Sequence, residues 1–242
     1  ELEEIRVQMT YCNIDTEEIR YFHSDYKLQE LKEWFNALIG EWKKWADFQY
    51  EWGIRCRTSC QALAFPFPYR KGQKKLITDV YRTLIRKKML FLQAPTGVGK
   101  TISTVFPAVK AVGEGYGNKI FYLTAKTITR TVAKDTFSIL KEQGLQAKVL
   151  ELTAKEKMCV CDEADCNPIS CPRAKGHFDR INDAVYDLLN SDRELNRETI
   201  LQQAERFQVC PFELSLDTAL WSDVIICDYN YVFDPNIYLK RF

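Results

Sequence analysis

A short apolar run, a glycine-containing loop and the start of a helix follow one another in "MLFLQAPTGVGKT", residues 89–101. The first four residues predict a short buried strand, and the pattern after the loop predicts a helix over about 99–113. In this context a loop wraps phosphates with its backbone N–H groups, and Gly97 and Gly99 permit the close approach. Lys100 is expected to reach the terminal phosphates, and Thr101 to offer its hydroxyl to Mg²⁺. The segment therefore predicts a site for ATP, with GTP as the alternative.

The first position of this phosphate-loop pattern is alanine where glycine is usual. Because the strand, loop and helix remain in register, a chance glycine-rich turn is the weaker interpretation. A second acidic motif is needed to hold Mg²⁺ and orient water, and Asp228 is not assigned that role because no glutamate follows it. The residues expected to contact nucleotide here are Ala94, Pro95, Thr96, Gly97, Val98, Gly99, Lys100 and Thr101.

Strands and helices alternate after the loop. The pattern predicts a strand at "KIFYLT", a helix over about 127–143, a strand at "AKVLEL" and, later, a buried strand at "DVIICD". Alternation of this kind implies crossover connections and a parallel sheet covered by helices. The predicted fold class is therefore α/β, with a parallel sheet of the RecA-like kind built on the phosphate loop.

Composition shifts predict four segments. Residues 1–63 read as an α+β piece: a hairpin of half-buried strands, then a helix with apolar residues at spacings of three and four. "FPFPYR" marks a boundary, and residues 64–152 form the first part of the α/β domain. Residues 153–216 read as a mostly helical insertion, and residues 217–242 return to the sheet. The helix residues expected to pack in a core are Leu28, Leu31, Phe35, Leu38, Trp42 and Trp45.

The charge balance gives no sign of a uniformly basic surface. The chain has 34 lysines and arginines against 33 acidic residues, so any surface for nucleic acid must be local. The acidic start lacks the basic and apolar regions of a signal peptide, and no apolar run is long enough to cross a membrane. We expect a cytoplasmic protein, monomeric and without a membrane partner. In that compartment thiols stay reduced, so clustered cysteines indicate metal binding rather than disulfides.

Four of the nine cysteines lie in "MCVCDEADCNPISCPRAKG", residues 158–176, and 38 residues separate the last of them from Cys210. Four thiolates suit either zinc or an iron–sulfur cluster. Paired Cys-x2-Cys knuckles, which structural zinc sites favour, do not occur, and the spacings of four residues suit a cubane cluster. Cys161 is left out, because it is expected to alternate with Cys159 along the chain. Arg173, Lys175 and Arg180 lie beside these cysteines, either along a DNA path or on a solvated face.

The motifs "FPYRKGQ", "QAPTGVGKT", "YLTAKTITR", "VCPFELS" and "ICDYNYVFDP", with the inserted cysteine segment, resemble the first motor domain of the XPD/DinG family of superfamily 2 DNA helicases. The resemblance runs from about residue 64 to the end. It implies a 5′-to-3′ motor on single-stranded or forked DNA, in repair or recombination. It also implies a [4Fe-4S] cluster held by Cys159, Cys166, Cys171 and Cys210, although Cys161 in place of Cys159 stays open.

The resemblance further implies roles for single residues. Arg70 and Gln73 are expected near the adenine, and Lys126, Thr127 and Arg130 on the DNA backbone, since hydroxyls and cations suit phosphates. Residues 1 to about 48 resemble the closing part of a RecB-like PD-(D/E)xK nuclease domain, as in bacterial members of the family. The DEAH box and second motor domain are not in this sequence, so we expect it to bind nucleotide without unwinding DNA. Two alternatives stay open: a zinc-stabilised nucleotide-binding module, and a regulatory DNA-binding piece of a nuclease.

Overall fold

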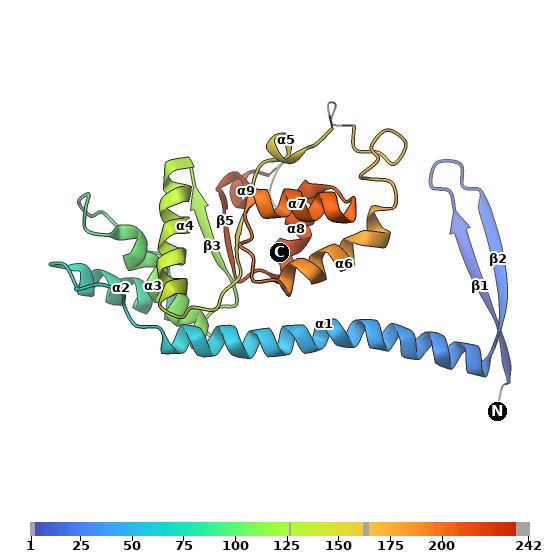
Figure 1. Cartoon of the computed structure of the whole chain (residues 1–242), viewed down its shortest axis with the longest axis horizontal. Coiled ribbons are helices and arrows are strands. Elements are labelled where there is room, and N and C mark those ends of the chain that lie inside the picture. Colours follow the sequence, from blue (N-terminus) through green and yellow to red (C-terminus); the bar gives the residue numbers. More distant parts are fainter. Residues whose placement is uncertain (1–2, 126, 162–164, 236–242) are drawn as a thin grey trace. The chain divides into compact units, whose positions relative to one another are not determined.

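A computed structural model of the chain describes residues 3–125, 127–161 and 165–235 (Figure 1). It divides into two compact units, Glu1–Trp52 and Gly53–Phe242. One long helix, α1 (Leu28–Ala62), begins in the first unit and contributes its last residues to the second.

The first unit contains a hairpin in which β1 (Glu4–Cys12) pairs antiparallel with β2 (Ile19–Lys27). The prediction of half-buried strands was wrong, because every residue of both strands is exposed. A two-stranded ribbon buries a face only when another layer covers it, and neither face is covered among the described residues. One face of the ribbon carries the exposed apolar residues Ile5, Val7, Met9, Tyr11, Phe22 and Tyr26.

Helix α1 runs well beyond the predicted stretch, and its apolar face does not form a core. Trp42 is 66% exposed, and Phe35 and Leu38 are about as open. The core-packing prediction for this face was therefore wrong: the 3.6-residue period identifies the apolar side of a helix but not whether anything packs on it. Within the second unit the end of α1 is buried at Cys56 and Cys60.

The sheet of the second unit confirms the predicted α/β class. Strands β3 (Ile120–Thr124), β4 (Val149–Glu151) and β5 (Val224–Asp228) are parallel, in the order β3-β5-β4. Figure 1 shows α3 (Lys100–Gly113) and α4 (Thr127–Glu142) on one side of this sheet. The central strand β5 is fully buried through Cys227, as expected of a strand covered on both faces.

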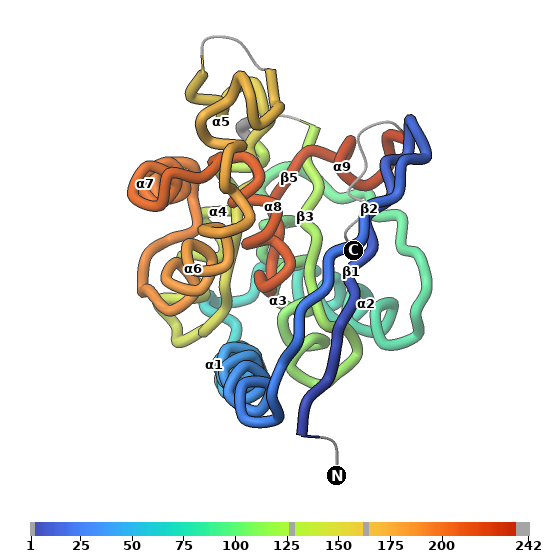
Figure 2. The backbone as a smooth tube through the Cα atoms, turned by 90° about the vertical axis from the view of Figure 1, so that its right-hand side faces the viewer, coloured from blue at the N-terminus to red at the C-terminus, as the bar shows by residue number. Residues whose placement is uncertain are grey.

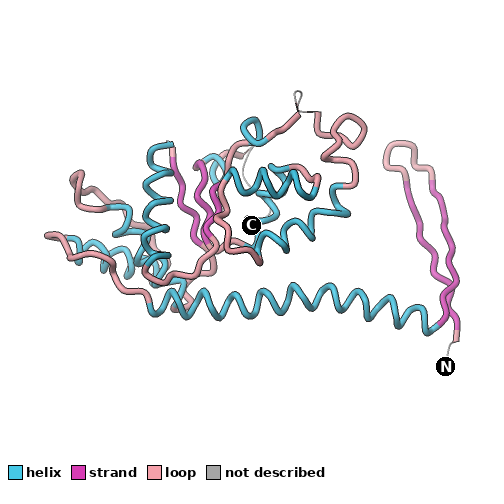
Figure 3. Tube along the Cα trace, in the orientation of Figure 1, coloured by secondary structure: helices cyan, strands magenta, loops and turns pink. Residues whose placement is uncertain are grey.

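The predicted strand before the phosphate loop is not formed. Helix α2 (Gln73–Ile85) is followed by an irregular stretch that continues to the start of α3 (Figure 3). In it Met89 is 87% exposed and Phe91 92% exposed. A strand exists only through pairing, and no described residue pairs with this stretch, so its apolar composition alone does not make it a sheet member.

The segment between β4 and β5 is helical, and its last helix continues beyond residue 216, the predicted end of the insertion. It contains α5 (Lys155–Met158), α6 (His177–Leu189), α7 (Arg197–Phe207) and α8 (Pro211–Trp221). Helices α6, α7 and α8 pack on one another and lie together in Figure 2. The short helix α9 (Asn230–Phe233) follows β5.

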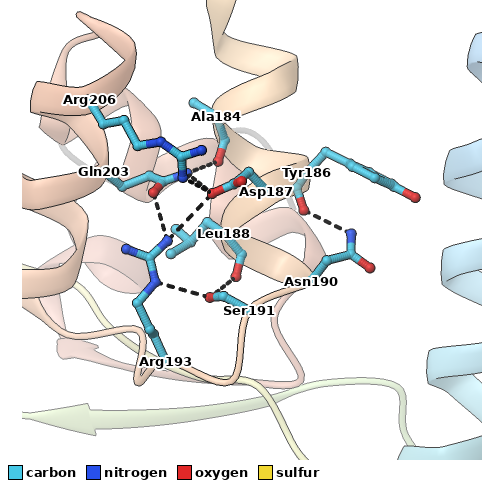
Figure 4. Close-up of polar contacts among 9 residues, drawn as sticks. All are labelled: Ala184, Tyr186, Asp187, Leu188, Asn190, Ser191, Arg193, Gln203 and Arg206. Carbon is cyan, nitrogen blue, oxygen red and sulfur yellow. Dashed lines mark hydrogen bonds and ion pairs between the residues drawn. The ribbon is translucent and has the colours of Figure 1, made fainter.

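Polar side chains join α6 to α7 (Figure 4). The Asp187 carboxylate accepts hydrogen bonds from Gln203 Nε2 at 2.9 Å and from Arg206 Nη1 at 2.8 Å. Gln203 is completely buried; its Nε2 also donates to Ala184 O, and its Oε1 accepts from Arg193 Nη2 at 2.7 Å. A buried amide with its donors and acceptor all used fixes the two helices against each other.

Lys148 gives the fold a measurable pH dependence. Its ammonium donates to Leu189 O, and burial lowers its pKa to about 8, against the opposing charge of Asp223. Between pH 8 and 10.5 the unfolded lysine holds a proton that the folded one has lost, so this residue makes the free energy of unfolding rise with pH. We therefore expect Lys148→Met to remove part of that rise in urea unfolding. A difference between the two proteins that stays constant from pH 7 to 10.5 would contradict it.

Candidate functional site

The phosphate loop lies at the start of α3, where the sequence places it. Gly97 and Gly99 have φ angles of 84° and 78°, in the left-handed region that glycine adopts without strain. Gly99 caps α3, so the first N–H groups of the helix open toward the loop. Lys100 Nζ donates to Ala94 O and Pro95 O, both at 2.9 Å, which closes the lysine over the loop. The arrangement has the backbone donors and the cation that phosphates require.

Gln73 and Arg70 brace this loop. Gln73 is 3% exposed, and its Nε2 donates to Val98 O at 3.1 Å and to Ser103 Oγ at 3.2 Å. Its Oε1 accepts from the backbone N–H of Arg70 at 3.0 Å, and the Arg70 guanidinium donates to Gly97 O. Both Nε2 protons of Gln73 are thus used within the protein. The predicted adenine contact of these two residues stays a prediction, and the role visible in the structure is to fix the loop.

Gly99→Ala tests this packing. A Cβ at Gly99 would lie 2.8 Å from Gln73 Nε2, and the residue would also keep a left-handed φ. We expect the left-handed backbone to cost about 1–2 kcal/mol in the free energy of unfolding, and displacement of Gln73 to weaken ATP binding in addition. The matched control is Gly115→Ala, which has a φ of 85° and open space around the new Cβ. Equal effects of the two substitutions on ATP affinity would rule out the brace.

A second polar site lies where the parallel strands end. A cavity of about 350 Å³ is lined by residues at or just after the carboxyl ends of β3, β4 and β5. Thr124 is 4% exposed, and its Oγ1 has no hydrogen-bond partner among the described residues. Ligands of open α/β sheets bind at this carboxyl edge. The lining residues include Thr124, Arg130, Thr153, Lys157, Asp228 and Asn230.

Arg130, predicted to touch DNA, is held by acidic partners. Its Nη2 lies 2.8 Å from Asp228 Oδ1 and its Nη1 3.7 Å from Glu151, and its side chain is 14% exposed. Lys126 lies outside the described residues, and Thr127 is placed only as the first residue of α4. The structure therefore brings one of the three predicted DNA residues to the strand-end cavity and pairs it there.

Sequence reasoning did not select Lys157 and Asn230, which also line this cavity. Each follows a strand of the sheet by a few residues, and the carboxyl ends of parallel strands meet at one edge. The signal was therefore present in the order of the strands, but neither residue belongs to a recognisable motif.

The cysteine segment differs from the prediction at Cys161. Its Sγ lies 3.9 Å from Cys171 Sγ, and Cys159 Sγ lies 3.7 Å from Cys161 O. Cys161, left out of the predicted ligand set, therefore lies beside Cys171, and the alternation of Cys159 and Cys161 stays a prediction. Contact with Cys171 raises the pKa of the Cys161 thiol.

The remaining two cysteines of the site are linked through their surroundings. Cys210 caps α8, and burial, with a smaller contribution from Cys166, raises the pKa of its thiol. A hydrogen bond to Cys166 raises the pKa of Lys155. In the described ranges no three cysteine, histidine or acidic side chains are grouped closely enough to hold a single metal ion. All five thiols belong to the insertion, however, and thiolates are the ligands of both zinc and iron–sulfur clusters.

The basic residues beside the cysteines are mainly structural. Arg173 pairs with Glu205 and donates to Ala204 O, while Arg180 donates to Phe207 O and Gln208 O. The Arg173 bonds tie the cysteine segment to the end of α7, and the Arg180 bonds tie α6 to it. Of the two interpretations of this group, a DNA path is the less supported for these two arginines.

Comparisons with known proteins agree with this arrangement. The DEAD_2 family matches residues 127–241. Regulator of telomere elongation helicase 1 from Homo sapiens is 22% identical, over 70% of this chain and 18% of its own length. Its homolog from Caenorhabditis elegans is 20% identical, over 73% of this chain and 22% of its own. The chain thus spans about a fifth of these relatives.

A solved XPD helicase has the same fold over 70% of this chain and 29% of its own, with a TM-score of 0.50 and 19% identity. None of the described helices is long and apolar enough to cross a membrane. The chain is thus similar to the DEAD_2 family over residues 127–241, to these helicases in sequence and to the XPD helicase in fold.

Proposed function

We propose that this chain is the nucleotide- and DNA-binding segment of a cytoplasmic ATP-dependent DNA helicase. The proposed enzyme moves 5′ to 3′ on single-stranded or forked DNA, in repair or recombination, and carries a [4Fe-4S] cluster in its insertion. The observation that carries the nucleotide part is the loop at α3, where Gly97 and Gly99 take left-handed conformations and Lys100 closes over the loop carbonyls.

The proposed role of each residue follows from the geometry of the phosphate loop. The backbone N–H groups at the start of α3 surround the phosphates, Lys100 moves from the loop carbonyls to the terminal phosphate oxygens, and Thr101 holds Mg²⁺. Gln73 holds the loop backbone in place through its hydrogen bond to Val98 O. Because the loop backbone is already formed, binding then requires the movement of the Lys100 side chain but no ordering of the loop.

The proposed cluster uses the thiolates of Cys159, Cys166, Cys171 and Cys210. Such a cluster would tie the segment after α5 to the start of α8, in addition to the hydrogen bonds of Arg173 and Arg180 to the end of α7. Because ligand binding is linked to folding, the cluster would stabilise the insertion.

DNA is proposed to run along the strand-end edge. Lys126, Thr127 and Arg130 remain the proposed phosphate contacts, and Lys157 and Asn230 add an ammonium and an amide at the same cavity. The Arg130 guanidinium is paired with Asp228. Arg130 is therefore proposed to hold the side chains of the cavity in position as well as to attract phosphate.

Single-stranded DNA binding should weaken steeply with salt. If about two or three phosphates are neutralised, raising salt from 50 to 200 mM is expected to lower the affinity by roughly tenfold, because released counterions favour dissociation. Fluorescence anisotropy with a labelled oligonucleotide measures this.

Lys157→Ala should flatten the salt dependence of that affinity, while the control Lys75→Ala, an exposed lysine paired with Asp79 on α2, should leave it unchanged. Binding that is insensitive to salt in the unmodified protein would contradict the phosphate contacts.

One observation favours a second candidate, a zinc-stabilised nucleotide-binding module. Two sulfurs that each lie about 2.3 Å from one tetrahedral zinc are about 3.8 Å apart, and Cys161 Sγ lies 3.9 Å from Cys171 Sγ. This candidate keeps the ATP site but gives the cysteines a purely structural role.

A further inference from the structure

The charges of the strand-end cavity do not suit a phosphate alone. Arg130 brings a positive charge, but its guanidinium already lies 2.8 Å from Asp228 and 3.7 Å from Glu151. Asp228 itself lines the cavity, and its side chain is 43% exposed. Because a carboxylate repels phosphate and accepts hydrogen bonds from N–H groups, the interior of the cavity favours a neutral group that carries hydrogen-bond donors.

Two polar atoms at this cavity lack hydrogen-bond partners. The hydroxyl of Thr124 and the Nε of Arg130 are buried, and neither is hydrogen-bonded within the part of the chain that the structure describes. Both residues line the cavity. Buried polar groups in proteins are almost always hydrogen-bonded, so these two atoms indicate that a ligand completes the site.

The cavity also offers an aromatic ring and an amide. Tyr229 is 50% exposed, and its backbone N–H donates to Thr124 O at 3.2 Å, which joins the ends of β3 and β5. Asn230 adds an amide that both donates and accepts hydrogen bonds. The volume of about 350 Å³ lies within the range of small-ligand pockets. A ring for stacking and polar groups for an edge are what hold a nucleobase that has left its stack.

The carboxylate of Asp228 selects among the nucleobases. Its two oxygens only accept hydrogen bonds, so they pair best with two neighbouring N–H groups. Guanine presents such a pair on its Watson–Crick edge, N1–H and the N2 amine, beside the acceptor O6. On the same edge of adenine, cytosine and thymine no two donors are adjacent. Asp228 therefore suits guanine, and the Asn230 amide suits O6.

We propose that the strand-end cavity receives one guanine base of the bound DNA strand. Asp228 accepts from N1–H and the N2 amine, Asn230 donates to O6, and the ring of Tyr229 stacks on the base. The inference rests on the proposed function, because the strand whose phosphates the protein binds delivers the base. DNA binding then carries a preference for guanine at one position of the strand.

The first experiment compares short labelled oligothymidylates that carry dG, dA or deoxyinosine at one central position. Fluorescence anisotropy with the full chain is expected to show about tenfold tighter binding of the dG strand than of the dA strand. Deoxyinosine keeps N1–H but lacks the N2 amine, so its affinity should fall between the two. Because base contacts release no counterions, the ratio of affinities should stay constant while salt rises and each affinity falls.

Asp228→Asn tests the carboxylate, and Glu151→Gln is its matched control. Both substitutions remove an acidic partner of Arg130, but the described residues that line the cavity include Asp228 and not Glu151. Asp228→Asn is expected to lose the preference for dG over dA, because an amide offers only one acceptor to the base. Glu151→Gln is expected to keep it. Loss of the preference in both variants, or in neither, would overturn the proposal.

Guanosine distinguishes a base delivered by the strand from a free nucleoside, because it has no phosphate for the loop at α3. Displacement of the dG strand by guanosine and not by adenosine would support the base site. Guanosine binding together with equal affinities for the dG and dA strands would assign the cavity to a free nucleoside and overturn delivery by DNA.

These outcomes separate the inference from the function on which it rests. Equal affinities for the dG and dA strands, with the usual loss of affinity in salt, contradict the guanine site alone and leave the proposed DNA binding in place. Failure to bind any of the strands contradicts the proposed DNA binding as well.

Discussion

Lys100→Ala should weaken ATP binding by about 10- to 100-fold, the loss expected when a charge-assisted hydrogen bond to phosphate is removed. The lysine now donates to Ala94 O and Pro95 O, so its ammonium already lies over the loop. Because those carbonyls can accept from water instead, the fold should survive. Calorimetric titration with ATP and Mg²⁺ measures the affinity.

Lys75→Ala is the matched control for this variant. It removes an exposed lysine whose partner, Asp79, lies one turn further along α2. We expect its ATP affinity to equal that of the unmodified protein. Unchanged ATP affinity in Lys100→Ala would show that the loop does not bind phosphate through this residue, and the nucleotide assignment would fall.

Cys171→Ser or Cys210→Ser should remove the metal and lower the free energy of unfolding by several kcal/mol, because metal binding is linked to folding. Cys171 contacts Cys161, and Cys210 caps the buried helix α8, so each joins the metal site to a different part of the insertion. Metal analysis and urea unfolding are measured on the same samples.

Two controls set the scale for the cysteine variants. Cys12→Ser lies in the exposed hairpin and should change neither metal content nor stability. Cys161→Ser should cost far less than Cys171→Ser, since Cys159 remains beside it. Equal losses in Cys161→Ser and Cys171→Ser would show that Cys161 is itself an indispensable ligand.

The α/β part of the chain was predictable because the apolar patterns of its strands and of its helices are both clear there. Strands β3 and β5 and helices α3 and α4 lie within a residue or two of the predicted ranges, since each apolar run is bounded by residues that end it. The positive φ angles of Gly97 and Gly99 were equally readable, because a loop that surrounds phosphate needs them.

The failures share a physical cause: periodicity describes one element and not its neighbour. "MLFL" has the composition of a strand, but pairing decides whether a strand forms. The apolar face of α1 was read correctly as apolar, yet Trp42 is mostly exposed because burial depends on a partner.

Within the site, the limits were in three-dimensional contacts. Nothing in the sequence shows that Gln73 donates to Val98 O in the loop and to Ser103 in α3, or that Asp228, 98 residues away, pairs with Arg130. The contact between Cys161 and Cys171, ten residues apart, was equally outside what the sequence shows.

The most direct measurement of the central claim is the metal content of unmodified protein purified without oxygen. Iron, acid-labile sulfide and zinc are assayed on one sample whose visible spectrum is recorded. The account predicts a brown protein with about four irons and four sulfides per chain. A colourless protein with about one zinc per chain would contradict the iron–sulfur helicase and favour the zinc-stabilised nucleotide-binding module.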